Sequence, residues 1–128
     1  MRKIFGYKWA ILWAVLMLSL FLWPSPSAGG FTFFEGFDKI VHCGLFFVFA
    51  ALLLHGKVRS SKTKVRKFKT GVSVLMIGAL FAFLTEGAQL LTDSRSADWW
   101  DIFADMVGTS MAVFSFFLFY LPYLKWNK

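Results

Sequence analysis

Residues 70–91 read TGVSVLMIGALFAFLTEGAQLL, a run of 22 residues whose only ionisable side chain is that of Glu86. A helix needs about 20 mostly apolar residues to cross the hydrocarbon core of a bilayer. This run therefore predicts a transmembrane helix, and it decides the fold class of the chain. It also places one acid near the end of a span, where a charge is costly unless it faces the protein interior.

Further apolar runs accompany this one at residues 5–23, 38–54 and 100–121. Pro24 and Pro122 directly follow the first and last runs and predict where those helices end. Only helices and closed barrels satisfy every backbone group in lipid, and the chain is too short for the roughly eight strands of the smallest barrels. We therefore predict an all-α membrane protein with four transmembrane helices in a compact bundle, forming one domain over residues 1–128.

The composition excludes the common soluble classes. Apolar residues make up 58% of the chain and charged residues 16%, whereas ordinary domains have about 45–50% and about 25%. With a mean hydropathy of +0.62, a water-soluble monomer would be covered in exposed apolar surface. The single cysteine, Cys43, excludes an intrachain disulfide and a cysteine-based zinc cluster.

Basic residues mark one side of the predicted bundle. Of the 14 lysines and arginines, three lie near the N-terminus, two near the C-terminus and seven in an acid-free loop at 57–69. The positive-inside rule makes this side cytoplasmic, with both termini inside. All seven acids fall in the opposite half, together with Lys39 and Arg95, which predicts an acidic outer side.

Two features allow a second interpretation. The basic loop could bind nucleic acid, but Phe68 is the only aromatic residue among its charges, so we expect contact with lipid headgroups and no nucleic-acid partner. The first span has the basic start and small-residue exit of a signal peptide. If the C-terminus is cytoplasmic, as the basic residues indicate, the first segment must be retained as a fourth span so that both termini lie on that side.

Polar side chains recur on one face of the second, third and fourth spans, at spacings of three or four residues. At 1.5 Å per residue, His42 lies about 6 Å inward from Asp38, and Glu86 about 7.5 Å inward from the end of its span. Asp105 lies at a similar depth, about 7.5 Å inward from Trp100. This common depth predicts an outward-opening polar cavity walled by the three spans. Its candidate binding residues are His42, Glu86, Gln89, Arg95, Asp98, Asp101 and Asp105.

Several of these residues also have structural interpretations. Asp38 and Asp98 are suitable N-caps for the second and fourth spans. Glu86 and Gln89 could form interhelical hydrogen bonds, and Arg95 could be a counter-ion to the acids. Small residues four apart share the polar faces and predict close helix approach: Gly78 and Ala82, and Gly108 and Ala112.

No nucleotide-binding, zinc-protease or serine-hydrolase motif occurs in the sequence. One histidine with several carboxylates could hold a hard divalent cation. No ligand spacing specifies a metal site, so the sequence indicates no particular metal and leaves the cofactor unknown. If the site is catalytic, its best candidates are His42, Glu86, Asp101 and Asp105.

Three motifs carry a resemblance to a known family: DKIVH at 38–42, TEGAQ at 85–89 and RSADWWDIFADMVG at 95–108. The chain resembles the VanZ-like family over about residues 37–112. The positions that match are Asp38, Lys39, His42, Glu86, Gln89, Arg95, Asp98, Asp101 and Gly108. Two positions depart from the pattern, with Asp105 where Asn is usual and Ala112 where a second Gly is common.

The resemblance implies a small protein of the bacterial inner membrane, in a family where some members lower susceptibility to teicoplanin-like lipoglycopeptides. Membrane lipids and a lipid-linked envelope precursor are then the expected partners. The favoured hypothesis is a protein whose outward acidic cavity binds an envelope headgroup, or a cation, and modulates glycopeptide access to the cell surface. An enzyme acting on lipid-linked envelope substrates, with Glu86 as base and Arg95 binding phosphate, stays open. A proton- or cation-coupled carrier is disfavoured because the polar residues lie near one surface.

Overall fold

The computed structural model describes residues 2–23, 36–61, 64–92 and 98–126, with side chains described within 4–119 of those ranges. Its helices are α1 (Arg2–Gly6), α2 (Lys8–Leu22), α3 (Phe37–Ser60), α4 (Lys67–Leu90) and α5 (Trp99–Trp126). Helices α1 and α2 together form the first predicted span. Four spans are long and apolar enough to cross a membrane, which confirms the predicted four-helix bundle and indicates a multi-pass membrane protein.

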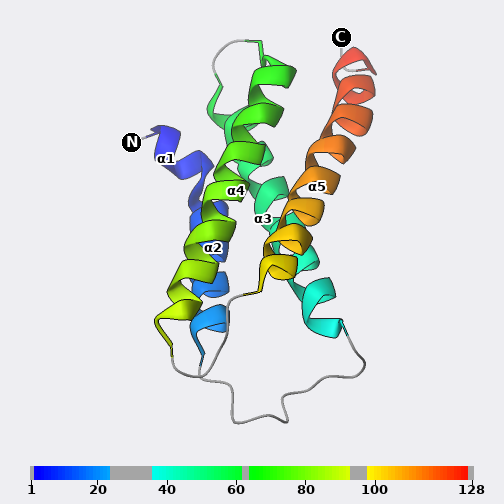
Figure 1. Cartoon of the computed structure of the whole chain (residues 1–128). Coiled ribbons are helices and arrows are strands. Elements are labelled where there is room, and N and C mark those ends of the chain that lie inside the picture. The colour runs from blue at the N-terminus through cyan, green and yellow to red at the C-terminus, as the bar shows by residue number, and fades with distance from the viewer. Residues whose placement is uncertain (1, 24–35, 62–63, 93–97, 127–128) are drawn as a thin grey trace.

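The two ends of the bundle differ in charge. Figure 1 shows the start of α1 and the end of α5 at the same end as the connection between α3 and α4. Basic residues lie in this connection and in the helix ends on either side of it. The acid-bearing ends of α3, α4 and α5 lie toward the opposite end. The predicted separation of charge along the bundle is confirmed for the described residues, whereas Glu35, Asp93 and Arg95 lie outside them. The cytoplasmic side of the basic end stays a prediction.

Two helix boundaries differ from the prediction. Helix α3 continues past Leu54 to Ser60, so Lys57 and Arg59 extend the helix instead of beginning a loop. Cations near a helix C-terminus interact favourably with the helix dipole, which supports this extension. The predicted helix end at Pro122 is wrong, because α5 continues to Trp126. A proline removes only a single backbone donor, and transmembrane helices tolerate that loss.

The first span is interrupted at Tyr7, whose φ of −99° and ψ of 1° separate α1 from α2. Helix α1 packs across the end of α3 at this point. A Cβ on Gly56 would lie 2.6 Å from Tyr7 Cδ1, and a Cβ on Gly6 would collide with Ser60 Oγ. Glycine at both positions therefore permits the contact between the two helices.

Aromatic side chains form much of the core. Phe81 of α4 packs on Phe46 and Phe49 of α3, with ring centroids 5.8 and 4.8 Å away, and Phe21 of α2 lies 6.5 Å from Phe46. Large apolar side chains also cover the outer faces of the helices, which suits lipid as the surrounding solvent. Examples that are more than half exposed are Leu80, Leu84, Phe103 and Phe114.

The first span is tied to α3 by Trp13, whose Nε1 donates a hydrogen bond to the Leu45 carbonyl at 3.1 Å. Trp13→Phe removes this bond and keeps an aromatic ring, so we expect it to lower the free energy of unfolding by about 1 kcal/mol. Thermal unfolding in detergent measures the effect. Ser19→Ala, which removes an exposed bond within α2, is the control. Equal stability of the two variants would contradict a role for the Trp13 bond.

Candidate functional site

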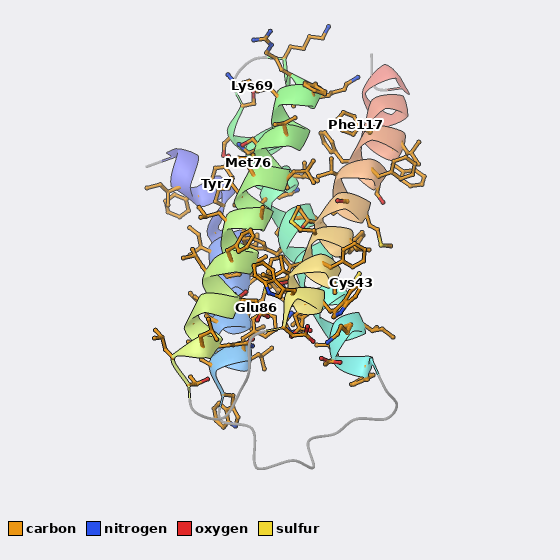
Figure 2. The ribbon with its side chains drawn as sticks, in the orientation of Figure 1. Tyr7, Cys43, Lys69, Met76, Glu86 and Phe117 are labelled. Atoms are coloured by element: carbon orange, nitrogen blue, oxygen red, sulfur yellow. The ribbon has the colours of Figure 1, made fainter. Side chains whose placement is uncertain are left out.

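Helices α3, α4 and α5 bring polar side chains together near the acidic end of the bundle. His42, Glu86 and Asp101 each offer a ligand atom, and these atoms lie within 4.8 Å of one another. Figure 2 shows Glu86 between α4 and the start of α5. The common depth predicted for His42, Glu86 and Asp105 is confirmed, since Asp105 also contacts His42. The side chains of His42, Glu86 and Asp101 are buried, and we call them, with Asp105 and Lys39, the polar cluster.

His42 is held in one orientation by Asp105, a carboxylate with no exposed surface. His42 Nδ1 lies 2.9 Å from Asp105 Oδ1. An ionised Asp105 only accepts hydrogen bonds, so it would place the proton on Nδ1 and leave the lone pair of the neutral imidazole on Nε2. His42 Nε2 faces Asp101, 3.8 Å from Oδ2.

Phe21 of α2 forms a further wall of the site. Its ring stacks on the His42 imidazole with centroids 4.5 Å apart and an interplanar angle of 15°. The sequence predicted that only the second, third and fourth spans would line the site, so the contribution of the first span was not predicted. Nothing in the sequence distinguishes Phe21, because it is one of 17 phenylalanines.

Lys39 joins three carboxylates from two parts of the chain. Its Nζ donates to Asp38 Oδ2 at 2.9 Å, to Asp98 Oδ2 at 2.9 Å and to Asp101 Oδ1 at 2.8 Å. The lysine hydrogen bond holds the pKa of Asp98, which precedes the last span, below its usual value. Lys39 was absent from the predicted site. Lys39 could have been identified because few basic residues lie in the acidic half of the sequence.

The two predicted N-caps have different outcomes. Asp98 is confirmed as a cap, because its Oδ1 accepts the Trp100 N–H at 3.0 Å at the start of α5. The prediction for Asp38 is wrong: Gly36, at φ 84°, precedes α3, and Asp38 lies in the first turn. Glycine adopts this left-handed backbone without steric cost, whereas Asp38 there places negative charge at the positive end of the helix dipole.

Glu86 and Gln89 both contact backbone of neighbouring segments. Glu86 Oε2 accepts the N–H of Asp98 at 3.2 Å, which links α4 to the start of α5. Gln89 Nε2 donates to the Phe21 carbonyl at 3.4 Å, as the hydrogen-bonding interpretation predicted. Arg95 lies outside the described residues. The ligand-binding role of all these residues, and the open cavity, stay predictions.

Glycines set the distance between the helices that carry the cluster. A Cβ on Gly108 of α5 would lie 2.9 Å from the carbonyl carbon of Cys43 and would collide with its oxygen. A Cβ on Gly78 of α4 would lie 2.7 Å from Thr109 Cγ2. The predicted close approach at these small residues is confirmed. It brings α5 against the backbone of α3 next to His42.

A protein-family model described as VanZ/LLP1 matches residues 3–120, nearly the whole chain. The chain belongs to the VanZ/LLP1 family. No curated protein and no solved structure matches it significantly. The matched segment contains the entire polar cluster, so the family assignment covers the residues described above.

Two acceptors in the polar cluster of this VanZ/LLP1 protein stand out. Glu86 Oε1 and Asp105 Oδ2 are buried and have no hydrogen-bond partner among the described residues. Lys39 already donates all three of its N–H groups to other carboxylates. Buried polar atoms normally have partners, because an unpaired one costs about 1–3 kcal/mol. The cluster therefore keeps capacity to accept a positive or hydrogen-bond-donating group.

Proposed function

We propose that this protein binds the polar headgroup of an envelope lipid or lipid-linked precursor at its acidic end, and thereby modulates glycopeptide access to the surface of a bacterial cell. The single observation that carries the proposal is the pair of buried, unpartnered acceptors on Glu86 and Asp105. Burying an ionisable group inside a membrane protein costs free energy, so such a group marks a candidate functional site. Membership of the VanZ/LLP1 family supports the choice of an envelope ligand.

The orientation follows from charge. The basic residues in and beside the connection between α3 and α4 favour the cytoplasmic side of the inner membrane for this end, with both termini on that side. The polar cluster then lies toward the outer surface, where envelope lipids and their precursors are exposed. Three spans supply its charged groups, so an occupant there would contact α3, α4 and α5 together.

A cell-surface assay tests this function. Wild type, Glu86→Gln and Asp101→Asn are expressed in a susceptible host at matched membrane abundance, and fluorescent teicoplanin bound per cell is measured. We expect wild type to lower the bound label and both variants to restore it to the level of host cells without the protein, because each removes a buried negative charge.

Gly87→Ala is the matched control, since it is next to Glu86 and a Cβ there meets no atom within 4 Å. It should act as wild type does. Unchanged activity in both charge variants would remove the polar cluster from the function. No effect of wild type would remove the link to glycopeptides.

A second candidate is an enzyme acting on lipid-linked envelope substrates. The observation that favours it is the imidazole held by Asp105 at 2.9 Å, with Nε2 turned toward a second carboxylate. Such an arrangement can exchange a proton with a substrate placed beside Nε2. Mass spectrometry of lipid-linked phosphate and glycan substrates incubated with purified protein distinguishes the two functions: a new product supports the enzyme, and bound but unaltered substrate supports the binding protein.

A further inference from the structure

We propose that His42, Glu86 and Asp101 bind one divalent transition-metal cation, and that Asp105 positions His42 for this role. The metal site stands on the geometry of the polar cluster alone. The further proposal that this ion contacts the headgroup rests on the function proposed above and adds detail to it. An acidic cluster repels phosphate, whereas a bound cation with free coordination positions attracts it.

The donor atoms have the spacing of a metal site. Atoms about 2.1 Å from a tetrahedral zinc ion lie ~3.4 Å from one another. The three donors here lie within 4.8 Å of one another, and His42 Nε2 is 3.8 Å from Asp101 Oδ2. Small side-chain shifts would therefore bring them around one ion. Three protein ligands would leave positions for water or a ligand oxygen, as in catalytic zinc sites.

Each ligand keeps a donor atom that the hydrogen bonds described above do not use. Asp105 accepts the His42 Nδ1 proton, so the Nε2 lone pair is available, in the carboxylate–histidine arrangement that orients metal-binding imidazoles. Glu86 Oε2 accepts a backbone N–H, which leaves the buried and unpartnered Oε1. Lys39 bonds Asp101 Oδ1, and Oδ2 remains on the side of His42.

Charge balance also favours a divalent cation. Glu86, Asp101 and Asp105 are buried carboxylates, and the Lys39 ammonium that pairs with Asp101 is shared with Asp38 and Asp98. This one lysine faces more carboxylates than it can neutralise, and an excess of buried negative charge is unfavourable. A divalent cation reduces that excess. The imidazole among the donors favours zinc or a similar transition metal over magnesium or calcium, which prefer oxygen ligands alone.

Ion binding by the purified, detergent-solubilised chain tests the site. The protein carries no histidine tag, and Zn²⁺ is titrated calorimetrically and counted by elemental analysis after gel filtration. We expect about one zinc ion per chain, with affinity falling more than about 100-fold in Glu86→Gln and Asp101→Asn because each removes a ligand charge. Asp105→Asn keeps an acceptor for Nδ1 but lowers the basicity of His42, so affinity should fall about 10–100-fold.

The two histidines provide a matched pair. His42→Gln should abolish binding, and His55→Gln, which changes an exposed residue near the other end of α3, should bind zinc as wild type does. Thermal unfolding without zinc identifies any variant that fails to fold. Co²⁺ gives an absorption signature that reports ligands directly in the folded variants. No stoichiometric ion in wild type, or unchanged affinity in folded Glu86→Gln and His42→Gln, overturns the site.

The results separate this inference from the proposed function. Stoichiometric zinc without any effect on teicoplanin binding retains the metal site and refutes the function. A Glu86-dependent effect on teicoplanin binding in a chain that binds no ion retains the function and refutes the metal. To test the link, glycerol 3-phosphate is titrated with and without Zn²⁺; binding that does not need the ion overturns the bridging role.

Discussion

Gly108→Ala is expected to lower the free energy of unfolding by about 2 kcal/mol, because the added methyl group overpacks the contact between α3 and α5. The Cβ would lie 2.9 Å from the Cys43 carbonyl carbon and closer to its oxygen. Backbone atoms cannot rotate away as a side chain can. Helix α5 must therefore shift, and the 2.9 Å contact between His42 and Asp105 lengthens with it.

Thermal unfolding in detergent measures this effect against two control variants, one on α3 and one on α4. Gly44→Ala on α3 and Gly87→Ala on α4 each add a methyl group that meets no atom within 4 Å. Alanine favours a helix over glycine by up to about 1 kcal/mol, so these variants should be as stable as wild type or more stable. Equal stability of Gly108→Ala and Gly44→Ala would contradict the close approach of α5 to α3.

Lys39→Met should lower the stability by about 2 kcal/mol at neutral pH, because it removes charge-assisted hydrogen bonds to three carboxylates. Lys39 is 31% exposed, so water screens part of the loss. The remaining acids Asp38, Asp98 and Asp101 then repel one another. Adding Asp101→Asn to Lys39→Met should recover part of the loss, whereas Lys64→Met, an exposed change near the opposite end, should have little effect.

The loss of stability in Lys39→Met should depend on pH. Lys39 holds the pKa of Asp98 below its usual value, so the pair contributes stability above the unfolded-state pKa of aspartate and loses it as the pH falls through the lower folded-state pKa. The difference between wild type and Lys39→Met should therefore be largest at neutral pH and should close below about pH 4. A difference that is constant across this range would show that Lys39 acts through packing and not through charge.

The chemistry of the polar cluster was partly predictable from sequence. The rise per residue of a helix fixes depth, so His42, Glu86 and Asp105 could be placed at one level before any tertiary contact was known. Rotation of each helix about its own axis was also constrained, because charged groups avoid lipid. Which atom bonds which depends on contacts between residues far apart in the chain, such as Gly108 against Cys43.

Other features of the site depend on backbone conformation or on tertiary contacts and could not be predicted from the sequence pattern. Gly36 precedes α3 in place of Asp38, since both residue types suit a helix N-cap and the backbone conformation decided between them. Phe21 came to stack on His42 only because α2 packs against α3. Lys39 could have been chosen from its isolation among acids, but its partners Asp98 and Asp101 lie 59 and 62 residues away in the chain.

The sequence by itself determined the four spans, the difference in charge between the two ends and the depth of the polar residues. It could do so because a bilayer imposes length, internal hydrogen bonding and a cost for charge on each helix separately. The tertiary structure decided that Lys39 would neutralise Asp101, that Asp105 would orient His42, and that Phe21 would cover the imidazole. These contacts depend on close approach of packed helices, which glycine permits and no single helix can specify.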